Sequence, residues 1–232
     1  MVLAAKVFLV KETIDLDTVT TKLKDFRSEQ EIEQEGQNIQ LLTEIKDLTI
    51  EKDSIRGIFY YDETLSIFHH GKTTYTPKTI AAPFIFDKLS ETLLLTVMEK
   101  KQRANSIANQ LSRILFIGTG QIVEARIKPE VLKSFHETNF DDTKVVFFDD
   151  VDVPNVSKLS LYGSTLGNTS LYTDYLTHGK IWYVVMHSRK YGYIVGVTRN
   201  AVITVFSRID EPEFSTYITG EIFPLIIQSY SS

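Results

Sequence analysis

The short connections between the β-rich segments of residues 39–98 constrain the fold more than any other feature of the sequence. Parallel neighbours need a crossover of about a dozen residues or more, whereas antiparallel strands can be joined by a tight turn. Turn residues stand at Asp62–Thr64 and His70–Lys72, directly between strand-like runs. This half of the chain therefore predicts a meander of antiparallel hairpins. Its expected strands are Ile39–Ile50, Ile55–Tyr61, Leu65–His69, Ala82–Phe86 and Leu93–Met98.

Two amphipathic segments flank this meander. Leu16–Phe26 has apolar residues at helical spacing, and Arg103–Leu115 places Ala104 and Ile107 on one apolar stripe. We expect both segments to be helices that bury one face. The stretch Arg27–Gln37 is polar and acidic, which indicates a solvated loop or a fraying helix end.

The second half of the chain repeats the pattern of strands and helices. The sequence predicts strands over Gln121–Ile127, Lys144–Phe148, Val156–Tyr162, Ile181–Met186, Tyr191–Thr198 and Ala201–Ser207, and helices over Glu130–Thr138, Ser170–Thr177 and Glu211–Ile222. Pro224 is expected to end or kink the last helix. The fold class is therefore α+β, with antiparallel β-meanders and about four or five helices. Residues 1–117 and 118–232 would form two similar lobes or one compact unit.

Charge and composition exclude several classes of protein. The chain has 25 Lys and Arg residues against 30 Asp and Glu residues, and this net charge of −5 gives no general attraction to nucleic acid or anionic membranes. The absence of cysteine excludes disulfides, cysteine-ligated zinc and thiol catalysis. No apolar run approaches the ~18 residues of a membrane helix. The N-terminal segment MVLAAKVFLVKE lacks the basic start of a signal peptide, so we expect a cytoplasmic protein with no membrane partner.

An apolar run ends in Gly118-Thr119-Gly120, as a dinucleotide-binding fingerprint begins. The third fingerprint position is Val123 instead of Gly or Ala, and Pro129 interrupts the helix that would hold the pyrophosphate. The run also continues the predicted helix Arg103–Leu115 without a loop. We therefore interpret this segment as a turn and expect no cofactor.

Carboxylates cluster around the strand predicted over Lys144–Phe148. Because Mg²⁺ prefers carboxylate oxygens, the Asp149–Asp152 cluster leaves a metal-dependent hydrolase or nuclease as one alternative. The other interpretation is that these residues only keep the strand ends solvated. The five histidines form no metal-binding pair at helical spacing, and no catalytic or metal-binding residue is assigned. The cluster comprises Asp141, Asp142, Asp149, Asp150 and Asp152.

Three basic segments interrupt this acidic chain, at residues 69–78, 100–113 and 186–193. Two of them combine Lys or Arg with Tyr, and such mixtures suit nucleic acid because cations bind phosphates and rings stack on bases. On the expected helix, Asn109 and Gln110 lie off the apolar stripe and can reach base edges. The alternative is an ordinary solvated surface. The candidate nucleic-acid-binding residues are Lys72, Lys78, Lys100, Lys101, Arg103, Arg113, Arg189 and Lys190.

No catalytic constellation emerges from these motifs. The leading functional prediction is therefore a non-enzymatic binding or interaction module of unknown partner and unknown oligomeric state. A protein partner would contact aromatic strand edges and exposed apolar residues, for which Tyr191, Tyr193, Phe206 and Tyr217 are candidates, although we expect most of these four to be core residues. The first alternative is a nucleic-acid-binding accessory protein that uses the basic segments, and the second is the metal-dependent hydrolase or nuclease.

Overall fold

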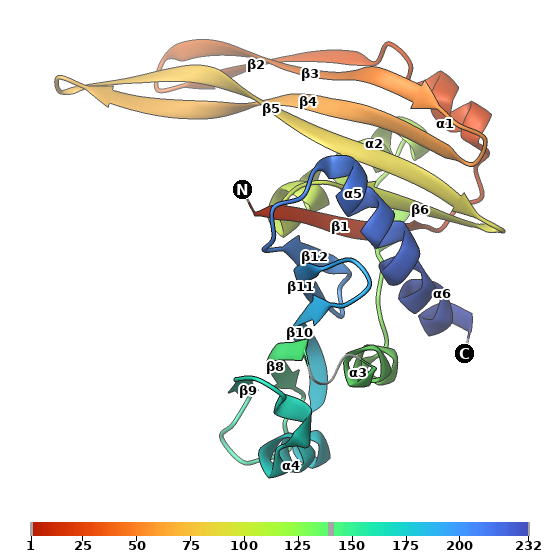
Figure 1. Ribbon diagram of the computed structural model, residues 1–232. Helices are drawn as coiled ribbons and strands as arrows, with labels where there is room; N and C mark the ends of the chain where they lie inside the picture. Colours follow the sequence, from red (N-terminus) through yellow and green to blue (C-terminus); the bar gives the residue numbers. More distant parts are fainter. Residues whose placement is uncertain (1, 139–141, 232) are drawn as a thin grey trace. The chain divides into compact units, whose positions relative to one another are not determined.

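The computed structural model describes residues 2–138 and 142–231, and these residues form twelve antiparallel strands together with helices (Figure 1). The predicted mixture of antiparallel sheet and helices is thereby confirmed. The strands are β1 (Leu3–Val10), β2 (Arg27–Gln34), β3 (Gln37–Ile50), β4 (Ser54–His69), β5 (Lys72–Leu89), β6 (Thr92–Val97), β7 (Ile122–Glu124), β8 (Thr143–Asp149), β9 (Leu159–Tyr162), β10 (Lys180–Ser188), β11 (Tyr193–Thr198) and β12 (Val202–Val205). The α-helices are α1 (Leu16–Leu23), α2 (Lys101–Phe116), α3 (Pro129–Glu137), α4 (Ser170–His178), α5 (Glu211–Tyr217) and α6 (Phe223–Ser231).

The chain divides into two compact units. Unit 1 comprises Met1–Val7 and Glu124–Ser232, and unit 2 comprises Phe8–Val123. The strand order is β2-β3-β4-β5-β6 in unit 2 and β12-β11-β10-β8-β9 in unit 1, and β1 contributes residues to both units. The C-terminal part of unit 1 begins at Glu124 and the first seven residues also belong to this unit, whereas the sequence suggested a single division near residue 118. The similarity of two lobes stays a prediction.

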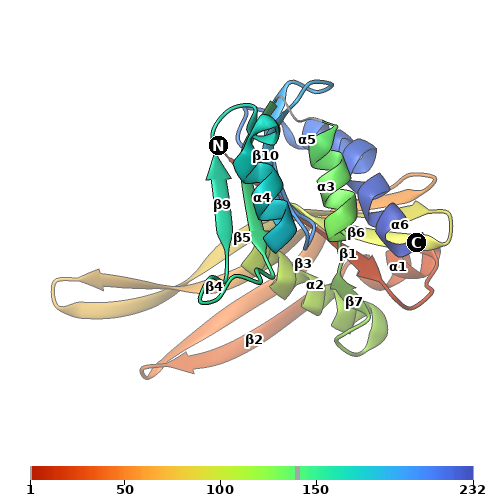
Figure 2. The ribbon, with the colours of Figure 1, turned by 90° about the horizontal axis from the view of Figure 1, so that it is seen from below.

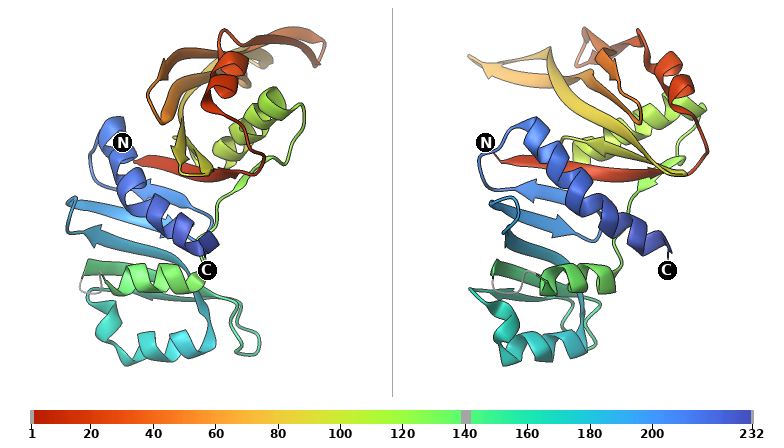
Figure 3. Two further views of the ribbon diagram at one scale, coloured as in Figure 1. Left: turned by 90° about the vertical axis from the view of Figure 1, so that its right-hand side faces the viewer. Right: turned by 45° about the vertical axis from the view of Figure 1, so that its right-hand side comes forward.

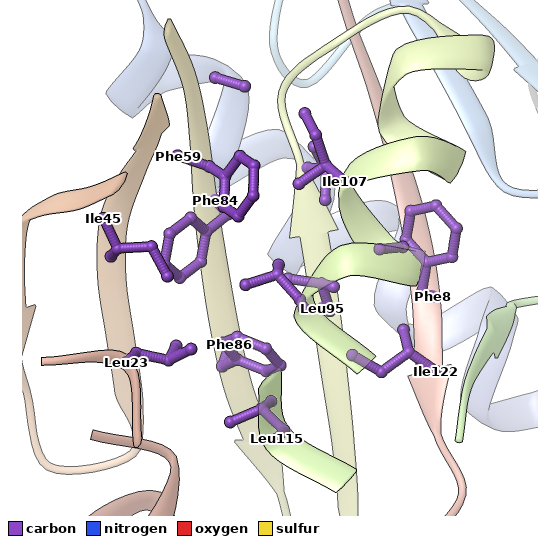
Figure 4. Packing of buried hydrophobic residues seen from close by; sticks show 14 of the residues in the cluster. Phe8, Leu23, Ile45, Phe59, Phe84, Phe86, Leu95, Ile107, Leu115 and Ile122 are labelled. Carbon is purple, nitrogen blue, oxygen red and sulfur yellow. The ribbon is translucent and has the colours of Figure 1, made fainter. Parts of the chain in front are cut away.

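The core of unit 2 forms where α2 covers strands of the sheet. Phe84 and Phe86 of β5 are fully buried, and Figure 4 shows Leu115 of α2 beside Phe86. Ile107 and Leu111 on the same helix are also 0% exposed, so the apolar stripe predicted from helical spacing is confirmed. Each such side chain contributes about 1.5–3 kcal/mol through burial. The core therefore fixes α2 on the sheet.

The segment Arg27–Gln37 is a hairpin, so its interpretation as a loop or a helix end is wrong. Strand β2 pairs with β3 along its whole length, up to Gln34 opposite Gln37. Glu35 and Gly36 form the two-residue turn at positive φ, 48° and 75°, which suits a hairpin. Strand β2 stands at the edge of the strand order and most of its side chains are exposed. Edge strands tolerate such a polar sequence.

Strand β4 runs without interruption through the predicted turn at Asp62–Thr64, so that turn is wrong. Its pairing with β5 is continuous from Ser54 to His69. The Asp62 carboxylate accepts hydrogen bonds from the Leu42 N–H at 2.9 Å and from the Thr79 hydroxyl at 2.7 Å. The side chain therefore bonds neighbouring strands instead of ending its own. The second expected turn is confirmed, because His70 and Gly71 join β4 to β5 at positive φ.

Unit 1 covers one face of its sheet with helices, which Figures 2 and 3 show across the strands. Phe148 of β8 contacts the rings of Tyr172 and Tyr175 in α4 at centroid distances of 6.2 and 5.8 Å. The strand residues Val197 and Ile203 are completely buried. The helices predicted over Glu130–Thr138 and Ser170–Thr177 correspond to α3 and α4 and are confirmed.

The C-terminal helical segment continues beyond Pro224 to Ser231, so of the two expected outcomes, an end or a kink of the helix, the first does not occur. A π turn, Ile218–Ile222, joins α5 to α6 directly before the proline, and the Phe223 N–H reaches the Ile218 carbonyl across it. Proline has no N–H to donate within a helix. The wider turn next to it lets the chain remain helical with one donor fewer. Within the described residues, no helix has the length and apolarity required to cross a bilayer.

Candidate functional site

A groove of about 550 Å³ in unit 2 is a candidate ligand site. Its volume lies within the ~300–1,000 Å³ typical of small-molecule sites. One side of its lining comes from α2 and the other from β2, β3, β4 and the residue before β2. The lining residues are Phe26, Ser28, Gln30, Leu41, Thr43, Tyr61, Asp62, Ser106, Asn109, Gln110, Arg113 and Ile114.

The polar side of α2 supplies the helix part of this lining. Ser106, Asn109, Gln110 and Arg113 follow each other at steps of three, one and three residues, which places them along one flank of a helix. Because the apolar stripe of α2 is buried against the core, this flank remains available to a ligand. Asn109 and Arg113 are exposed, and Gln110 is half-buried.

The strand residues that line the groove lie on one face of the sheet because side chains alternate along a strand. Ser28 is paired with Thr43, and Gln30 is paired with Leu41, so these four side chains share a face of the β2–β3 ladder. Thr43 is in turn paired with Tyr61 of β4. The groove thus presents hydroxyl and amide groups from both sides. Such groups donate and accept hydrogen bonds without carrying charge.

Two charged residues line the groove, and only one of them already has partners for its charge. The Asp62 carboxylate already accepts the hydrogen bonds from Leu42 and Thr79. Arg113, in contrast, forms no ion pair with any residue in the described ranges 2–138 and 142–231. Its guanidinium has five donors in a planar fork that matches phosphate or carboxylate. The groove can therefore accept an anion at its Arg113 end.

A hydrogen-bonded network adjoins the groove at Tyr61. The Tyr61 hydroxyl donates to Glu63 at 3.2 Å, and Arg103 donates to both oxygens of Glu63 at 3.1 and 2.9 Å. Burial, together with the charge of Glu63, raises the pKa of Tyr61 to about 12. The hydrogen bonds from Arg103 hold the pKa of Glu63 below its ordinary value. At neutral pH, Tyr61 is therefore a neutral hydroxyl and Glu63 a carboxylate.

The structure separates the eight predicted nucleic-acid-binding residues into three groups. Only Arg113 lines the groove. Arg103 forms ion pairs with Glu63 and Glu99, Arg189 forms one with Asp142, and Lys190 forms one with Glu221. The remaining residues are exposed and have no ion pair with a described residue: Lys72, Lys78, Lys100 and Lys101. Lys72 lies at the turn of the β4–β5 hairpin, whereas Lys100 and Lys101 lie at the start of α2.

The acidic residues at the end of β8 and directly after it each lie near a basic group. Asp149 accepts a hydrogen bond from Arg199, Asp150 lies 3.9 Å from the Lys180 ammonium, and Asp152 lies 2.8 Å from Nδ1 of His178. Burial raises the pKa of Asp149. Asp141 lies outside the described residues. Within those residues, no three His, Asp or Glu side chains gather as metal ligands.

The Gly118–Gly120 segment follows a helix, whereas a dinucleotide fingerprint follows a strand. Helix α2 extends through Phe116 and ends at Ile117, which has a left-handed backbone with φ of 65°. The Ser112 hydroxyl then donates to the Gly118 carbonyl at 2.8 Å. The segment is therefore a helix end that turns toward β7.

A cluster of aromatic rings in unit 1 was missed by sequence reasoning. Phe147 of β8 lies 5.6 Å from Tyr162, 5.6 Å from Trp182 and 5.4 Å from Tyr183 between ring centroids. A bulge between Ile181 and Tyr183 shifts the pairing register of β10. In the sequence, only the adjacent aromatic residues at 182 and 183 point to such a bulge. Without a bulge, the regular alternation of side chains would place their rings on opposite faces of the sheet.

The aromatic residues predicted as protein contacts have different surroundings. Tyr217 is fully buried, and its ring lies 5.2 Å from Tyr191 and 6.3 Å from Tyr193. Tyr191 and Tyr193 are half-buried in the same group. Phe206 is 48% exposed, so it alone of the four offers a largely accessible ring.

A scan against known protein families finds no match to this sequence, and a search among curated proteins finds no relative. The function of the chain is therefore inferred from the chemistry of its residues.

Proposed function

We propose that the chain is a non-enzymatic binding protein and that the groove of unit 2 binds a nucleotide unit. The observation that carries this proposal is Arg113, a cation without an ion-pair partner among the described residues, beside a row of amide and hydroxyl groups. A nucleotide combines the two features that such a site recognises. Its phosphate matches the guanidinium, and its base edge offers adjacent hydrogen-bond donors and acceptors.

The amides supply the second part of the argument. Asn109, Gln110 and Gln30 all line the groove, and an Asn or Gln amide can form two parallel hydrogen bonds with a base edge. The groove contains few apolar residues, which disfavours a purely hydrophobic ligand. A bound nucleotide would keep these polar groups hydrogen-bonded when water leaves.

The two alternative functions have weaker support. Of the eight residues predicted to recognise nucleic acid through the basic segments, Arg103, Arg189 and Lys190 are already paired with carboxylates, whereas the other five have no ion pair with a described residue. A metal-dependent hydrolase would use the Asp149–Asp152 cluster, whose carboxylates lie against Arg199, Lys180 and His178. Each alternative would therefore have to use charges that are in part already compensated.

Calorimetric titration with the four ribonucleoside monophosphates at low salt tests the groove. We expect at least one of them to bind, and Arg113→Gln to weaken that binding about ten- to hundredfold, because a hydrogen bond to a charged group contributes about 1.5–3 kcal/mol. Lys101→Gln is the matched control, since it removes the same charge from an exposed position on the same helix outside the groove. Its affinity should equal that of the unmodified protein.

Two results would contradict the proposal. One is the absence of binding for all four nucleotides at low salt. The other is equal weakening by Arg113→Gln and Lys101→Gln, which would show that only the total charge matters. Asn109→Ala then resolves the base contact, because it should change the preference among the four bases while leaving phosphate binding in place.

A further inference from the structure

The aromatic cluster of unit 1 lies on the face of its sheet that the helices leave uncovered. Phe148 faces α4, and neighbouring strand residues point to opposite sides, so Phe147 lies on the other face. Tyr162 on the same side is 68% exposed, while Phe147, Trp182 and Tyr183 are each half-buried. This face therefore presents several accessible ring surfaces instead of a closed core.

Backbone geometry holds one of these rings in place. A Cβ atom at Gly196 of β11 would lie 2.5 Å from the Tyr183 hydroxyl oxygen and 2.9 Å from a carbon of its ring. Only glycine therefore allows Tyr183 to lie across β11 as it does. Tyr183 therefore packs directly on the backbone of β11.

A lysine ammonium lies beside the aromatic rings of this face. The Lys158 ammonium lies 5.1 Å from the centroid of the Trp182 ring and forms no ion pair with a described residue. The nearby carboxylates of Asp149 and Asp150 are instead paired with Arg199, and Lys180 lies close to Asp150. An anion that approaches the rings would thus meet an available positive charge.

We propose that this face binds single-stranded nucleic acid by stacking bases on Tyr162 and Trp182 while Lys158 meets the backbone. Rings that are partly exposed and accompanied by a cation suit a strand of alternating bases and phosphates. A purely apolar partner would have to desolvate the Lys158 ammonium without replacing its hydration. The inference is independent of the groove, because it uses other residues and a longer ligand.

Trp182 provides the measurement, because it is the only tryptophan in the sequence. We expect twelve-nucleotide oligo(dT) to quench its fluorescence in a saturable way at low salt, since a stacked base quenches indole emission. A duplex of the same length should bind at least tenfold more weakly, because its bases already stack on each other. Parallel titration with oligo(U) distinguishes DNA from RNA as the preferred strand.

Variants assign the effect to the rings. Tyr162→Ala should weaken binding about tenfold, and Tyr162→Phe should restore it, because stacking needs the ring and not the hydroxyl. Lys158→Gln should reduce the dependence of affinity on salt. Phe68→Ala is the control, because Phe68 is an aromatic residue 74% exposed in unit 2. Both Tyr162 and Lys158 are exposed, so these variants are expected to fold.

The absence of quenching by either oligonucleotide at low salt would overturn the proposal. Quenching that Tyr162→Ala leaves unchanged would overturn it as well, since the bases would then lie elsewhere. Equal affinity for the duplex and the single strand would also contradict stacking on these rings.

Discussion

Unit 1 buries an ionisable group completely and unit 2 buries one in part, and the two groups have opposite chemistry. In unit 2, burial raises the pKa of the Asp87 carboxyl to about 6. In unit 1, burial lowers the pKa of the His136 imidazole to about 4, and its Nδ1 lies 2.9 Å from the Thr143 hydroxyl. Both shifts favour the neutral form, as desolvation requires. Since one group is an acid and the other a base, their effects on stability oppose each other as pH changes.

The direction of each effect follows from proton linkage. Between about pH 4 and 6, folded Asp87 holds a proton that the unfolded chain has lost, so its contribution to stability falls as pH rises. Between about pH 6.5 and 4, unfolded His136 gains a proton that the folded chain excludes, so its contribution falls as pH falls. Lowering the pH should therefore increase the contribution of Asp87 to the stability of unit 2 and decrease the contribution of His136 to the stability of unit 1.

The largest expected effect tests whether the core of unit 2 can be disturbed by itself. Leu111→Ala should lower the free energy of unfolding by about 2–5 kcal/mol, because it removes a fully buried side chain and leaves a cavity. Urea denaturation measures the loss, and amide hydrogen exchange assigns it to residues 8–123. Leu65→Ala, at a position 42% exposed in the same unit, should stay within about 0.5 kcal/mol. A loss below 0.5 kcal/mol for Leu111→Ala would show that α2 does not hold the core.

The next effect concerns the imidazole in unit 1. Acidification from pH 7 to pH 4 should remove up to about 3 kcal/mol through His136, because each unit of pKa shift corresponds to about 1.4 kcal/mol. His136→Gln keeps a hydrogen-bonding side chain but cannot gain the proton. The variant should therefore lose less stability over this range than the unmodified protein, as followed by the fluorescence of Trp182. If the stability of the two proteins changed with pH in the same way, the protonation of His136 would not be the cause of the loss.

The smallest effect concerns the carboxyl in unit 2. Asp87→Asn should raise the free energy of unfolding at pH 7 by about 1–2 kcal/mol, because it removes a partly buried charge while keeping the shape. Below about pH 3 the gain should vanish, because Asp87 is then protonated and neutral in both the folded and the unfolded chain. Urea denaturation at the two pH values measures this difference. A gain of equal size at both pH values would mean that the charge of Asp87 is not its cause.

The predicted fold was most accurate where turn chemistry and the apolar pattern agree. His70-Gly71 and the stripe through Ile107 both gave the correct element because a short local pattern determines each of them. The β2–β3 hairpin was missed because the charged side chains of β2 face solvent along an edge strand, so no apolar alternation marks it. The turn at Asp62 was wrong because its carboxylate bonds Leu42 and Thr79, residues that are distant in sequence.

The candidate site, like the fold, was predictable from the sequence only in part. Asn109, Gln110 and Arg113 could be selected from sequence because helical spacing places them together off the apolar stripe. On the strand side of the groove, Leu41, Thr43 and Tyr61 lie in predicted strands, but Ser28 and Gln30 belong to β2, which was missed, so this side could not be assembled from sequence. The ion pair between Arg103 and Glu63 joins residues forty positions apart, and no local pattern reveals such a contact. The aromatic face depends in part on the bulge in β10, which sequence alternation does not indicate.

Strand β1 gives the chain an unusual order of assembly. Leu3–Lys6 pair with Val202–Val205 of β12, so this part of the unit 1 sheet joins segments roughly 200 residues apart. During synthesis at about 5–20 residues per second, residues 3–6 wait tens of seconds for their partner strand. The whole of Phe8–Val123 emerges in the meantime. Unit 2 can therefore fold on the ribosome while unit 1 still lacks its last strand pair, and slow translation would favour that sequence of events.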